Sequence, residues 1–369
     1  MSVFRCGLIV NPVAGLGGEV ALKGSDGAAN QQLAIRLGGV SRATERAARA
    51  LESFRSNSQI EVITGSGSLG AAAAEQAGVS HRVVYRQPGE VTTASDTKRL
   101  AALLAQLDVD LIVFAGGDGT ARDLCEVLGE SQTVLGIPSG VKMHSGVFAV
   151  TPEDAGHVIR ATMRGSVGGE VVDIVDIDED ARRSGRLQSR LYGRMMVPRM
   201  AVGIQSGKRS SLPPGSHTVR GIASDIAARL RAGETCLFGP GTTVQAIGHS
   251  LGLELSLLGV DVVRDGAVIG TDLDADGLGR AVGAERFQVV VSPIGGQGII
   301  LGRGNQQLDG RLLERLHPDD LIIACTVQKL GELGGVLLVD TPTVALNHKF
   351  SGFRRVVTGY RQEAVVRVS

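Results

Sequence analysis

The chain has 369 residues, 43% of them hydrophobic, and is long enough for two domains with separate cores. Its 38 basic residues balance its 38 acidic ones, so no net charge favours nucleic acid or an anionic membrane as a partner. No apolar run reaches the roughly 18 residues of a membrane span, so we expect no transmembrane helix.

The cysteines and the N-terminal sequence indicate the cellular compartment in which the protein is expected. Cysteines occur four times in isolation, which predicts neither a zinc site nor a disulfide scaffold and favours the reducing cytoplasm: Cys6, Cys125, Cys236 and Cys325. The N-terminus predicts a first strand rather than a signal peptide.

Glycine is the unusual residue, because its 52 copies are about twice the usual frequency of ~7%. They gather at apparent strand ends, where a backbone can approach a ligand closely.

Helices and strands alternate in the first half of the chain. Strands are expected at residues 5–11, 60–64, 81–86, 110–115 and 133–138, with helices at 41–54, 94–107 and 120–129. Strict alternation predicts right-handed crossovers and a parallel sheet. The near-continuous Ile, Val and Leu of these strands predicts that both faces of the sheet are covered.

The second half begins differently and then returns to alternation. Strand-like patterns at 170–177 and 190–198 precede an exposed loop at 206–216, and we place a domain boundary near Thr151. Helices are then expected at 218–233, 242–252 and 304–316, and strands at 235–241, 257–263, 287–294, 321–327 and 335–340. The prediction is α/β throughout: a nucleotide-binding domain over 1–150 and a second, partly β-rich domain over 151–340, with 341–369 pairing back onto either.

The sequence GGDGT, Gly116–Thr120, lies between a buried strand and a helix. In an open parallel sheet, ligands bind at the carboxyl ends of strands, where a helix N-terminus suits phosphate. Gly116, Gly117 and Gly119 would let the backbone touch a polyphosphate. Because a carboxylate repels phosphate, Asp118 is expected to meet Mg²⁺ or a substrate hydroxyl. An aspartate that merely caps the helix is the alternative.

Two further glycine-rich turns follow strands of the same expected sheet. They are NPVAGLGG at 11–18 and GIPSGVKMHS at 136–145. Three glycine-rich strand exits on one edge would together line a cleft, although each alone could be an ordinary loop.

These stretches resemble the superfamily of NAD kinases and diacylglycerol-type lipid kinases, whose signature is GGDGT. Within it, the chain is most similar to the ATP–NAD kinase-like proteins, a group that includes AcoX-type acetoin-catabolism proteins. Further supporting stretches are LKGSDG, FGPGTT and SPIGGQGIILGRGNQQL, so the resemblance spans nearly the whole chain.

The resemblance implies a kinase that uses Mg²⁺ and ATP, or polyphosphate, and a hydroxyl acceptor such as NAD. Asp118 would be catalytic, serving the acceptor hydroxyl or binding the metal. The implied nucleotide-binding residues in the three turns and in the helix after GGDGT are Asn11, Gly15, Gly116, Gly117, Gly119, Thr120, Asp123 and Ser139.

Three departures from the family pattern put the acceptor in question. NAD kinases have a β-rich C-terminal domain, whereas α/β is expected here after Thr218. The Asn–Glu or Asn–Asp pair usual after GGDGT is replaced by Arg122–Asp123. The lipid-kinase run P-x-G-T-x-N-D is absent, because Gly140 is followed by Val141, Lys142, Met143 and His144. Lys142 would neutralise phosphate and His144 would orient an acceptor, or both are ordinary surface and helix residues.

Other candidates lie outside the three main turns. In PIGGQGIILGRGNQQL, Gly295 and Gly296 would free the backbone, Arg303 would clamp a phosphate, and Asn305 would contact a base or sugar; a solvated hairpin is the alternative. Residues 238–243, FGPGTT, form a second phosphate site or a plain turn. Lys23 and Asp26 are similar candidates, and the acidic run from Asp173 to Asp180 either binds Mg²⁺ or forms a solvated turn.

Three further functions compete with the kinase prediction. GSGSLG at 65–70 matches a dinucleotide fingerprint, with Arg86 after the next strand to accept the 2′-phosphate of NADP, and would make an oxidoreductase. A nucleotide- or NAD-binding accessory protein without turnover is a second alternative. A lipid kinase is the third, although no basic amphipathic helix supports it. A homodimer is expected with any of these functions.

Overall fold

The structure is a computed structural model that describes residues 3–16, 18, 20, 28–88, 92–140, 143, 145–177, 189–199, 217–294 and 298–369. It divides into two compact units. The first comprises Met1–Leu16, Ser25–Gln31 and Val40–Gly207, and the second comprises Gly17–Gly24, Gln32–Gly39 and Lys208–Ser369. No helix among the described residues is long and apolar enough to cross a membrane.

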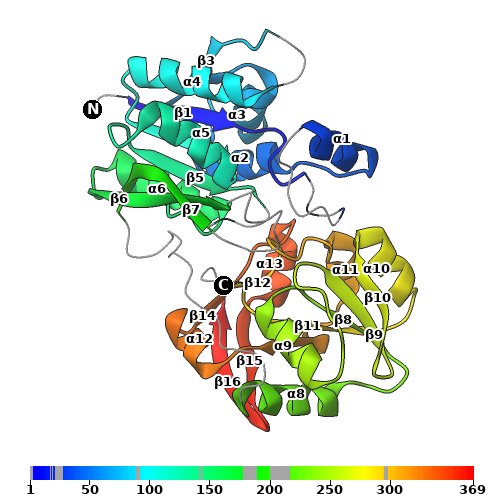
Figure 1. The fold of residues 1–369 in the computed structure, drawn as a ribbon. Coiled ribbons are helices and arrows are strands. Elements are labelled where there is room, and N and C mark those ends of the chain that lie inside the picture. The colour runs from blue at the N-terminus through cyan, green and yellow to red at the C-terminus, as the bar shows by residue number, and fades with distance from the viewer. Residues whose placement is uncertain are drawn as a thin grey trace. The chain divides into compact units, whose positions relative to one another are not determined.

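The first unit, shown in Figure 1, is built on a five-stranded, all-parallel sheet. The strand order is β3-β2-β1-β4-β5. Its strands are β1 Phe4–Val10, β2 Ile60–Gly65, β3 His81–Tyr85, β4 Leu111–Gly116 and β5 Val134–Pro138. This confirms the parallel α/β sheet expected from the apolar runs. The chain moves outward from β1 to β3 and then crosses to the other side of β1, so the strand order reverses between β1 and β4.

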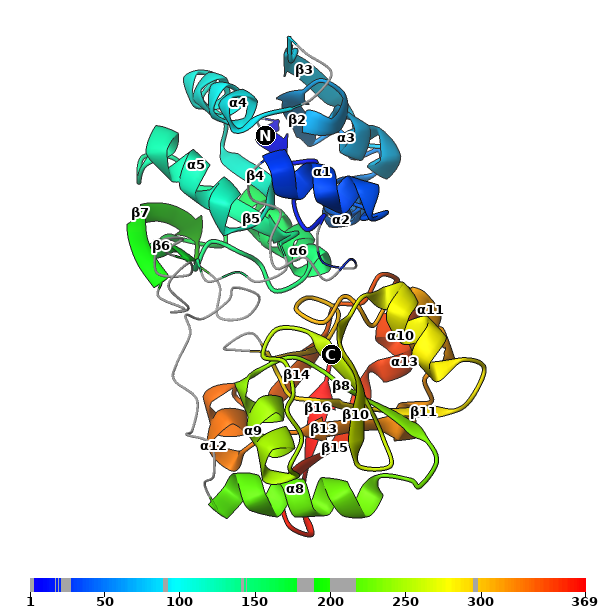
Figure 2. The ribbon, with the colours of Figure 1, turned by 45° about the vertical axis from the view of Figure 1, so that its right-hand side comes forward.

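Helices cover both faces of this sheet, as predicted. They are α2 Ala43–Leu51, α3 Ala71–Ala77, α4 Ala94–Gln106, α5 Asp118–Leu128 and α6 Pro152–Met163, whereas α1 Ala28–Arg36 is divided between the two units. Figure 2 shows α4 and α5 on one face and α2, α3 and α6 on the other. Alternate residues of β4 enter two separate cores: Val113 packs with the α2, α3 and α6 layer, and Phe114 packs with α4 and α5. Continuous apolar strands are therefore required.

Local signals set several helix starts. Thr93 and Asp96 form a capping box at α4, and Thr151 and Asp154 form another at α6, with Pro152 at the first helical position. The second capping box lies at the position expected for the domain boundary. α6 nevertheless belongs to the first unit, because its apolar residues share a core with those of α2.

The first unit also contains an antiparallel pair, β6 Gly169–Ile177 and β7 Ser189–Pro198. The pair packs on α5: a Cβ at Gly193 would lie 2.6 Å from Cys125 Sγ. This packing places β6 and β7 in the first unit.

The second unit has a nine-stranded mixed sheet, in agreement with the predicted partly β-rich α/β domain. Its order is β10-β9-β8-β11-β13-β15-β16-β14-β12. The strands are β8 Thr235–Phe238, β9 Val260–Arg264, β10 Ala267–Leu273, β11 Phe287–Val291, β12 Ile299–Leu301, β13 Leu321–Ala324, β14 Val336–Val339, β15 Gly352–Gly359 and β16 Gln362–Val368. Thus β15 and β16, from the C-terminal segment, pair within this second sheet.

Six helices of the described chain cover this sheet. They are α8 His217–Arg229, α9 Thr242–Ser250, α10 Ala275–Val282, α11 Gly310–Arg315, α12 Val327–Glu332 and α13 Val344–Phe350. α8 and α9 bury their apolar residues in one core, and α10 to α13 bury theirs in another. The helix expected at 304–316 was wrong in its first half. Gly302 donates its N–H to Asn305 Oδ1 over 2.8 Å, which makes a turn, and Asp309 caps the helix that follows.

The cysteines are free thiols in different environments. Cys6, Cys236 and Cys325 are buried, whereas Cys125 is half-buried on α5. Burial raises the pKa of Cys6 to about 12 and that of Cys325 to about 11. Thiols with such pKa values are protonated at neutral pH and unreactive.

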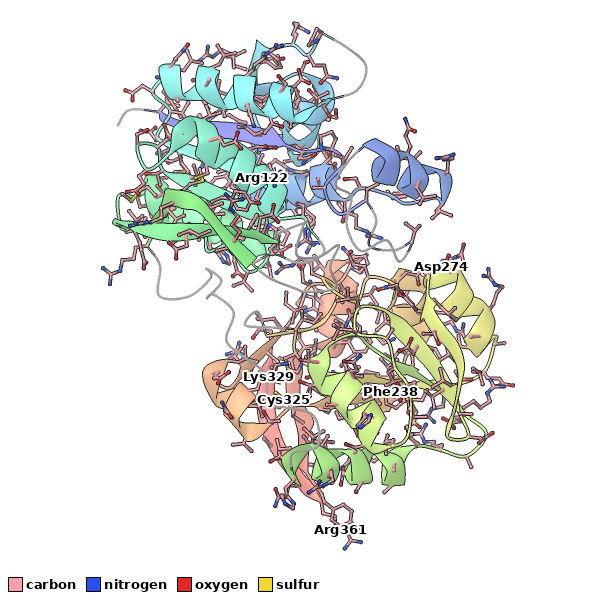
Figure 3. The ribbon with its side chains drawn as sticks, viewed as in Figure 1. Arg122, Phe238, Asp274, Cys325, Lys329 and Arg361 are labelled. Atoms are coloured by element: carbon pink, nitrogen blue, oxygen red, sulfur yellow. The ribbon has the colours of Figure 1, made fainter. Side chains whose placement is uncertain are left out.

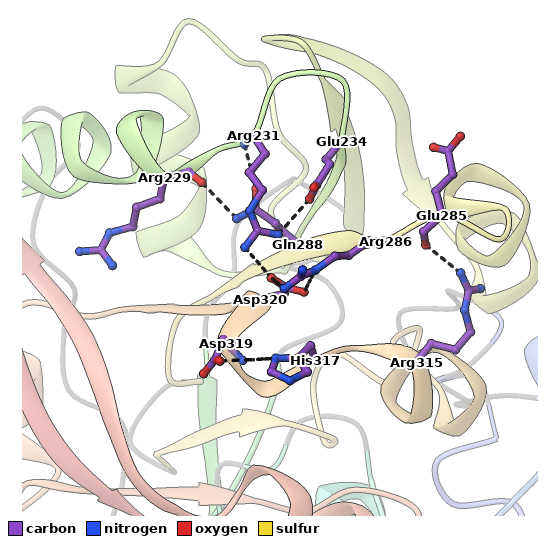
Figure 4. Close-up of polar contacts among 10 residues, drawn as sticks. All are labelled: Arg229, Arg231, Glu234, Glu285, Arg286, Gln288, Arg315, His317, Asp319 and Asp320. Atoms are coloured by element: carbon purple, nitrogen blue, oxygen red, sulfur yellow. Dashed lines mark hydrogen bonds and ion pairs between the residues drawn. The ribbon is translucent and has the colours of Figure 1, made fainter.

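A buried carboxylate ties the amino ends of three adjacent strands together (Figure 4). Asp320, which precedes β13, is 0% exposed and accepts hydrogen bonds of 2.6 and 2.9 Å from Arg286, which precedes β11. Arg231, before β8, lies 2.8 Å from the same carboxylate. Burial alone would raise the pKa of Asp320, but the two guanidinium groups outweigh it and lower the pKa.

We predict that Asp320→Asn lowers the free energy of unfolding by about 2–3 kcal/mol at pH 7, below the ~3–5 kcal/mol of fully buried pairs because both arginines reach solvent. Because the folded pKa is depressed, the carboxylate stabilises the fold above its unfolded pKa of about 3.9. That stability is lost as the pH falls through the lower folded value. Urea unfolding at pH 7 and at acid pH measures both effects. Asp319→Asn, at a carboxylate that is 82% exposed, is the control and should change little; equal losses would contradict the prediction.

Candidate functional site

The reversal of strand order between β1 and β4 marks the place where an open parallel sheet binds ligands, outside the carboxyl ends of its strands. All three predicted glycine-rich turns leave from this edge, because they follow β1, β4 and β5. Since these strands are neighbours in the sheet, the structure brings the turns together, as the sequence had suggested.

Asn11 links the first turn to the second. Its backbone N–H donates to Ala115 O over 2.9 Å, and its side-chain Nδ2 donates to Thr120 Oγ1 over 2.9 Å. Its Oδ1 also accepts from Val13 N at 3.2 Å. The Asn11 side chain therefore fixes the β1 turn against the first turn of α5.

The glycines allow the turns to approach one another. Gly15 has a φ of +72°, and a Cβ there would lie 2.3 Å from Ser139 O. A Cβ on Gly140 would lie 3.0 Å from Gly117 Cα, and the N–H of Ser139 donates to Gly116 O over 2.9 Å. These glycines are thus needed for contact between backbones, before any ligand is considered.

Asp118 is the first residue of α5, at the centre of this arrangement. Gly117, rather than Asp118, occupies the N-cap position. The Asp118 side chain is 6% exposed, and its Oδ1 accepts a hydrogen bond of 3.0 Å from Ser145 N. Ser145 is fixed in turn, because its hydroxyl bonds both the N–H and the C=O of Val175 in β6. Gly119 and Thr120 complete the first turn of the helix.

A cation that was not expected from the sequence reaches this edge from the opposite helix layer. Arg46 of α2 is 6% exposed, and its Nε donates to Pro138 O at the end of β5. It lies on the buried side of α2, among alanines. A lone arginine in an otherwise apolar helical stripe is the signal that would have found it.

The Arg122–Asp123 pair, one turn further along α5, faces other elements. Arg122, labelled in Figure 3, lies 3.0 Å from the Asp176 carboxylate of β6, and its Cζ is 5.4 Å from the ring centroid of Tyr192. Asp123 lies 3.4 Å from Lys98 of α4. Burial raises the pKa of the Asp123 carboxyl, although Lys98 opposes the shift. Nucleotide binding by Asp123 remains a prediction.

Arg303 and Asn305 belong to the second unit, and their side chains form an ion pair or hydrogen bonds with other residues of that unit. Arg303 is 2% exposed, and its Nε lies 2.6 Å from the Asp340 carboxylate. Both ends of the Asn305 amide bond local backbone, at Gly302 N and Ile300 O. These bonds account for the two residues within the fold, and their binding of phosphate or a nucleoside remains a prediction.

Some of the remaining candidates lie among the described residues, and others lie outside them. In GSGSLG, Gly70 packs locally, since a Cβ there would lie 2.1 Å from Thr64 Oγ1. No three His, Cys, Asp or Glu side chains of the described residues are grouped to hold a metal ion. Several candidates lie outside the described residues: Lys23, Asp26, Lys142, His144, Asp178, Glu179, Asp180, Gly295 and Gly296.

Comparisons with known families agree with this geometry. The ATP-NAD kinase N-terminal domain matches residues 6–167, and the ATP-NAD kinase C-terminal domain matches residues 232–368. The first match contains all three turns, and the second begins just before β8. No curated protein matches the chain.

We predict that Gly15→Ala destabilises the first unit more than a glycine replacement without a contact. Gly165 is the matched control, since it has a φ of +64° and nothing within 4 Å of its Cβ position. Gly165→Ala should cost about 1 kcal/mol for its conformation alone. Gly15→Ala should cost about 1–3 kcal/mol more, because the new methyl group meets Ser139 O. Urea midpoints compare the two variants, and equal losses would refute the backbone contact.

Proposed function

Because the chain belongs to the ATP-NAD kinase family, and is thus an NAD kinase-like phosphotransferase at the family level, we propose that it transfers the terminal phosphoryl group of ATP to a hydroxyl group of NAD or a related small molecule. The observation that carries the proposal is the placement of Asp118. A nearly buried carboxylate starts α5 at the strand-order reversal, and Ser145 orients it.

The donor is assigned to the converging turns. Gly116, Gly117, Gly119 and Thr120 present backbone at the N-terminus of α5, where the helix dipole favours negative charge. Asn11 supports this turn through Thr120, and Gly15 and Ser139 close its neighbours. A binding site made of backbone at a helix N-terminus recognises phosphates rather than a base, so polyphosphate is the second donor to test.

Asp118 is assigned to the acceptor. In the proposed reaction its carboxylate takes the proton of the acceptor hydroxyl, whose oxygen bonds to the γ-phosphorus while the bond to the β–γ bridging oxygen breaks and ADP leaves. Phosphoryl transfer depends mainly on such positioning and on neutralised charge. A lone carboxylate beside nucleotide phosphates suits Mg²⁺, which is commonly held by one or two carboxylates plus substrate phosphates. Asp118 would hold it, and the ion would neutralise phosphate charge.

A nucleotide- or NAD-binding accessory protein without turnover is the second candidate. It is favoured by the Arg122–Asp123 pair, because Arg122 contacts Asp176 and Tyr192 while Asp123 contacts Lys98. Neither side chain of the pair contacts the glycine-rich turns in the described interactions. A lipid kinase is the third candidate, and failure to bind lipid vesicles would retire it.

We predict that the wild-type protein forms NADP from Mg²⁺–ATP and NAD, and that Asp118→Asn lowers kcat at least about 10²-fold while ATP binding persists. Asp110→Asn is the matched control, because Asp110 also accepts a backbone hydrogen bond, 2.7 Å from Arg5 N, but precedes β4 at the opposite end of the sheet. Its turnover should stay near wild type.

The same assay separates the alternatives. NADP formation from polyphosphate would identify the second donor. If no sample forms NADP but titration shows nucleotide binding, either the acceptor is not NAD or the accessory function holds. Full activity in Asp118→Asn would overturn the assignment of Asp118.

A further inference from the structure

The second unit has a carboxyl edge of its own. β8, β11, β13 and β15 run parallel to one another and therefore end on the same side of their sheet. The segment after β8 enters α9, the segment after β11 begins at Ser292, and the segment after β13 enters α12. None of these segments belongs to the three glycine-rich turns of the first unit.

Lys329 of α12, labelled in Figure 3, contacts the residues that follow β11, the strand beside β13. Its Nζ lies 3.4 Å from Ser292 Oγ and also donates to Pro293 O. Ser292 is 4% exposed, and Lys329 is half-buried. The ammonium group is thus held over the strand end by neutral oxygens.

The charge of Lys329 lacks a close counter-charge. In the part of the chain that the structure describes, no carboxylate forms an ion pair with it; Glu332 is the nearby acidic group that favours its charged form, and the Cys325 thiol is protonated at neutral pH. Burial lowers the pKa of the Lys329 ammonium. Removing a cation from water without an anionic partner is costly, and an anion bound beside it would offset that cost.

The adjoining strand exit, after β8, brings two glycines and the start of α9 to the same edge. Gly239 packs against Val291, the residue before Ser292, with 3.2 Å between its Cβ position and Val291 Cγ1. Gly241, the N-cap of α9, has a φ of +121° and nothing within 4 Å of its Cβ position. The positive end of the α9 dipole therefore borders open space at the same edge.

We propose that Lys329 and Ser292 bind a phosphate group at the carboxyl edge of the second unit. The Lys329 ammonium supplies the counter-charge, and the Ser292 hydroxyl supplies a hydrogen-bond donor beside it. The ligand class is a free phosphate or the phosphate of a small molecule. Neither residue belongs to the three glycine-rich turns, so the site can be tested separately from the proposed kinase reaction.

Selective labelling of the full-length protein with pyridoxal 5′-phosphate tests the proposal. Its aldehyde condenses with a neutral lysine amine, releasing water, and borohydride reduces the imine to a stable secondary amine. Peptide mass spectrometry then gives the labelling rate at each lysine. We expect pyrophosphate to slow labelling of Lys329 about tenfold when it exceeds its Kd about tenfold.

Lys349 is the matched control within the same unit. Its Nζ is also held by backbone carbonyls, at 3.0 Å from Leu313 O and 2.7 Å from Glu314 O. Its labelling should not respond to pyrophosphate. Unchanged labelling of Lys329, or equal protection of both lysines, would overturn the proposal.

Variants and competing ligands complete the test. In a calorimetric titration, the Lys329→Gln protein should bind one equivalent of pyrophosphate fewer than the wild type, whereas the Lys349→Gln protein should bind as many as the wild type. A folded Lys329→Gln protein with unchanged stoichiometry refutes the site. If that variant does not fold, protection of the wild-type lysine decides alone. Protection by inorganic phosphate identifies a simple phosphate site, and protection by ATP without inorganic phosphate identifies a nucleotide site.

Discussion

Contact between bare backbones is the constraint on which the first unit depends. The turns after β1, β4 and β5 meet where the strand order reverses, and Gly15, Gly117 and Gly140 stand at the places of closest approach. A side chain at these positions would push the turns apart and carry Asn11 away from Thr120. The packing that forms the fold is therefore also what gathers the start of α5, Asp118 and the neighbouring strand ends into one place.

Much of this arrangement could be predicted, because its signals are local. Apolar runs bounded by glycine located β1 to β5, and their alternation with helices indicated the parallel sheet. Long-range partners could not be predicted: the ion pair of Arg303 with Asp340 depends on how distant segments meet. The helix expected from residue 304 failed because the periodicity of its apolar residues did not reveal that Asn305 bonds a backbone amide. Arg46 was missed because its signal is a single charge in an alanine-rich helix, far in sequence from the turn that it contacts.

The buried charges at the two ends of the parallel strands in the second unit differ in how well they are compensated. Before the strands begin, Asp320 is surrounded by two guanidinium groups and is fully compensated. Where they end, Lys329 faces neutral oxygens. Compensation at the first end contributes to folding, whereas an uncompensated charge at the other is typical of sites that bind ligands. This difference in charge compensation between the two ends, rather than any sequence motif, is why we propose a ligand site at the carboxyl edge of the second unit.

The placement of the thiols has a practical consequence for spectroscopy. Cys6, Cys236 and Cys325 are buried, and Cys125 is the least buried of the four thiols, although burial also raises its pKa, so we expect a maleimide dye or spin label to react first, if slowly, at Cys125. Replacing that one residue by serine would give a background on which a single engineered cysteine can be labelled cleanly. Pairs of such labels, one in each unit, would then report the distance between the units as ligands are added.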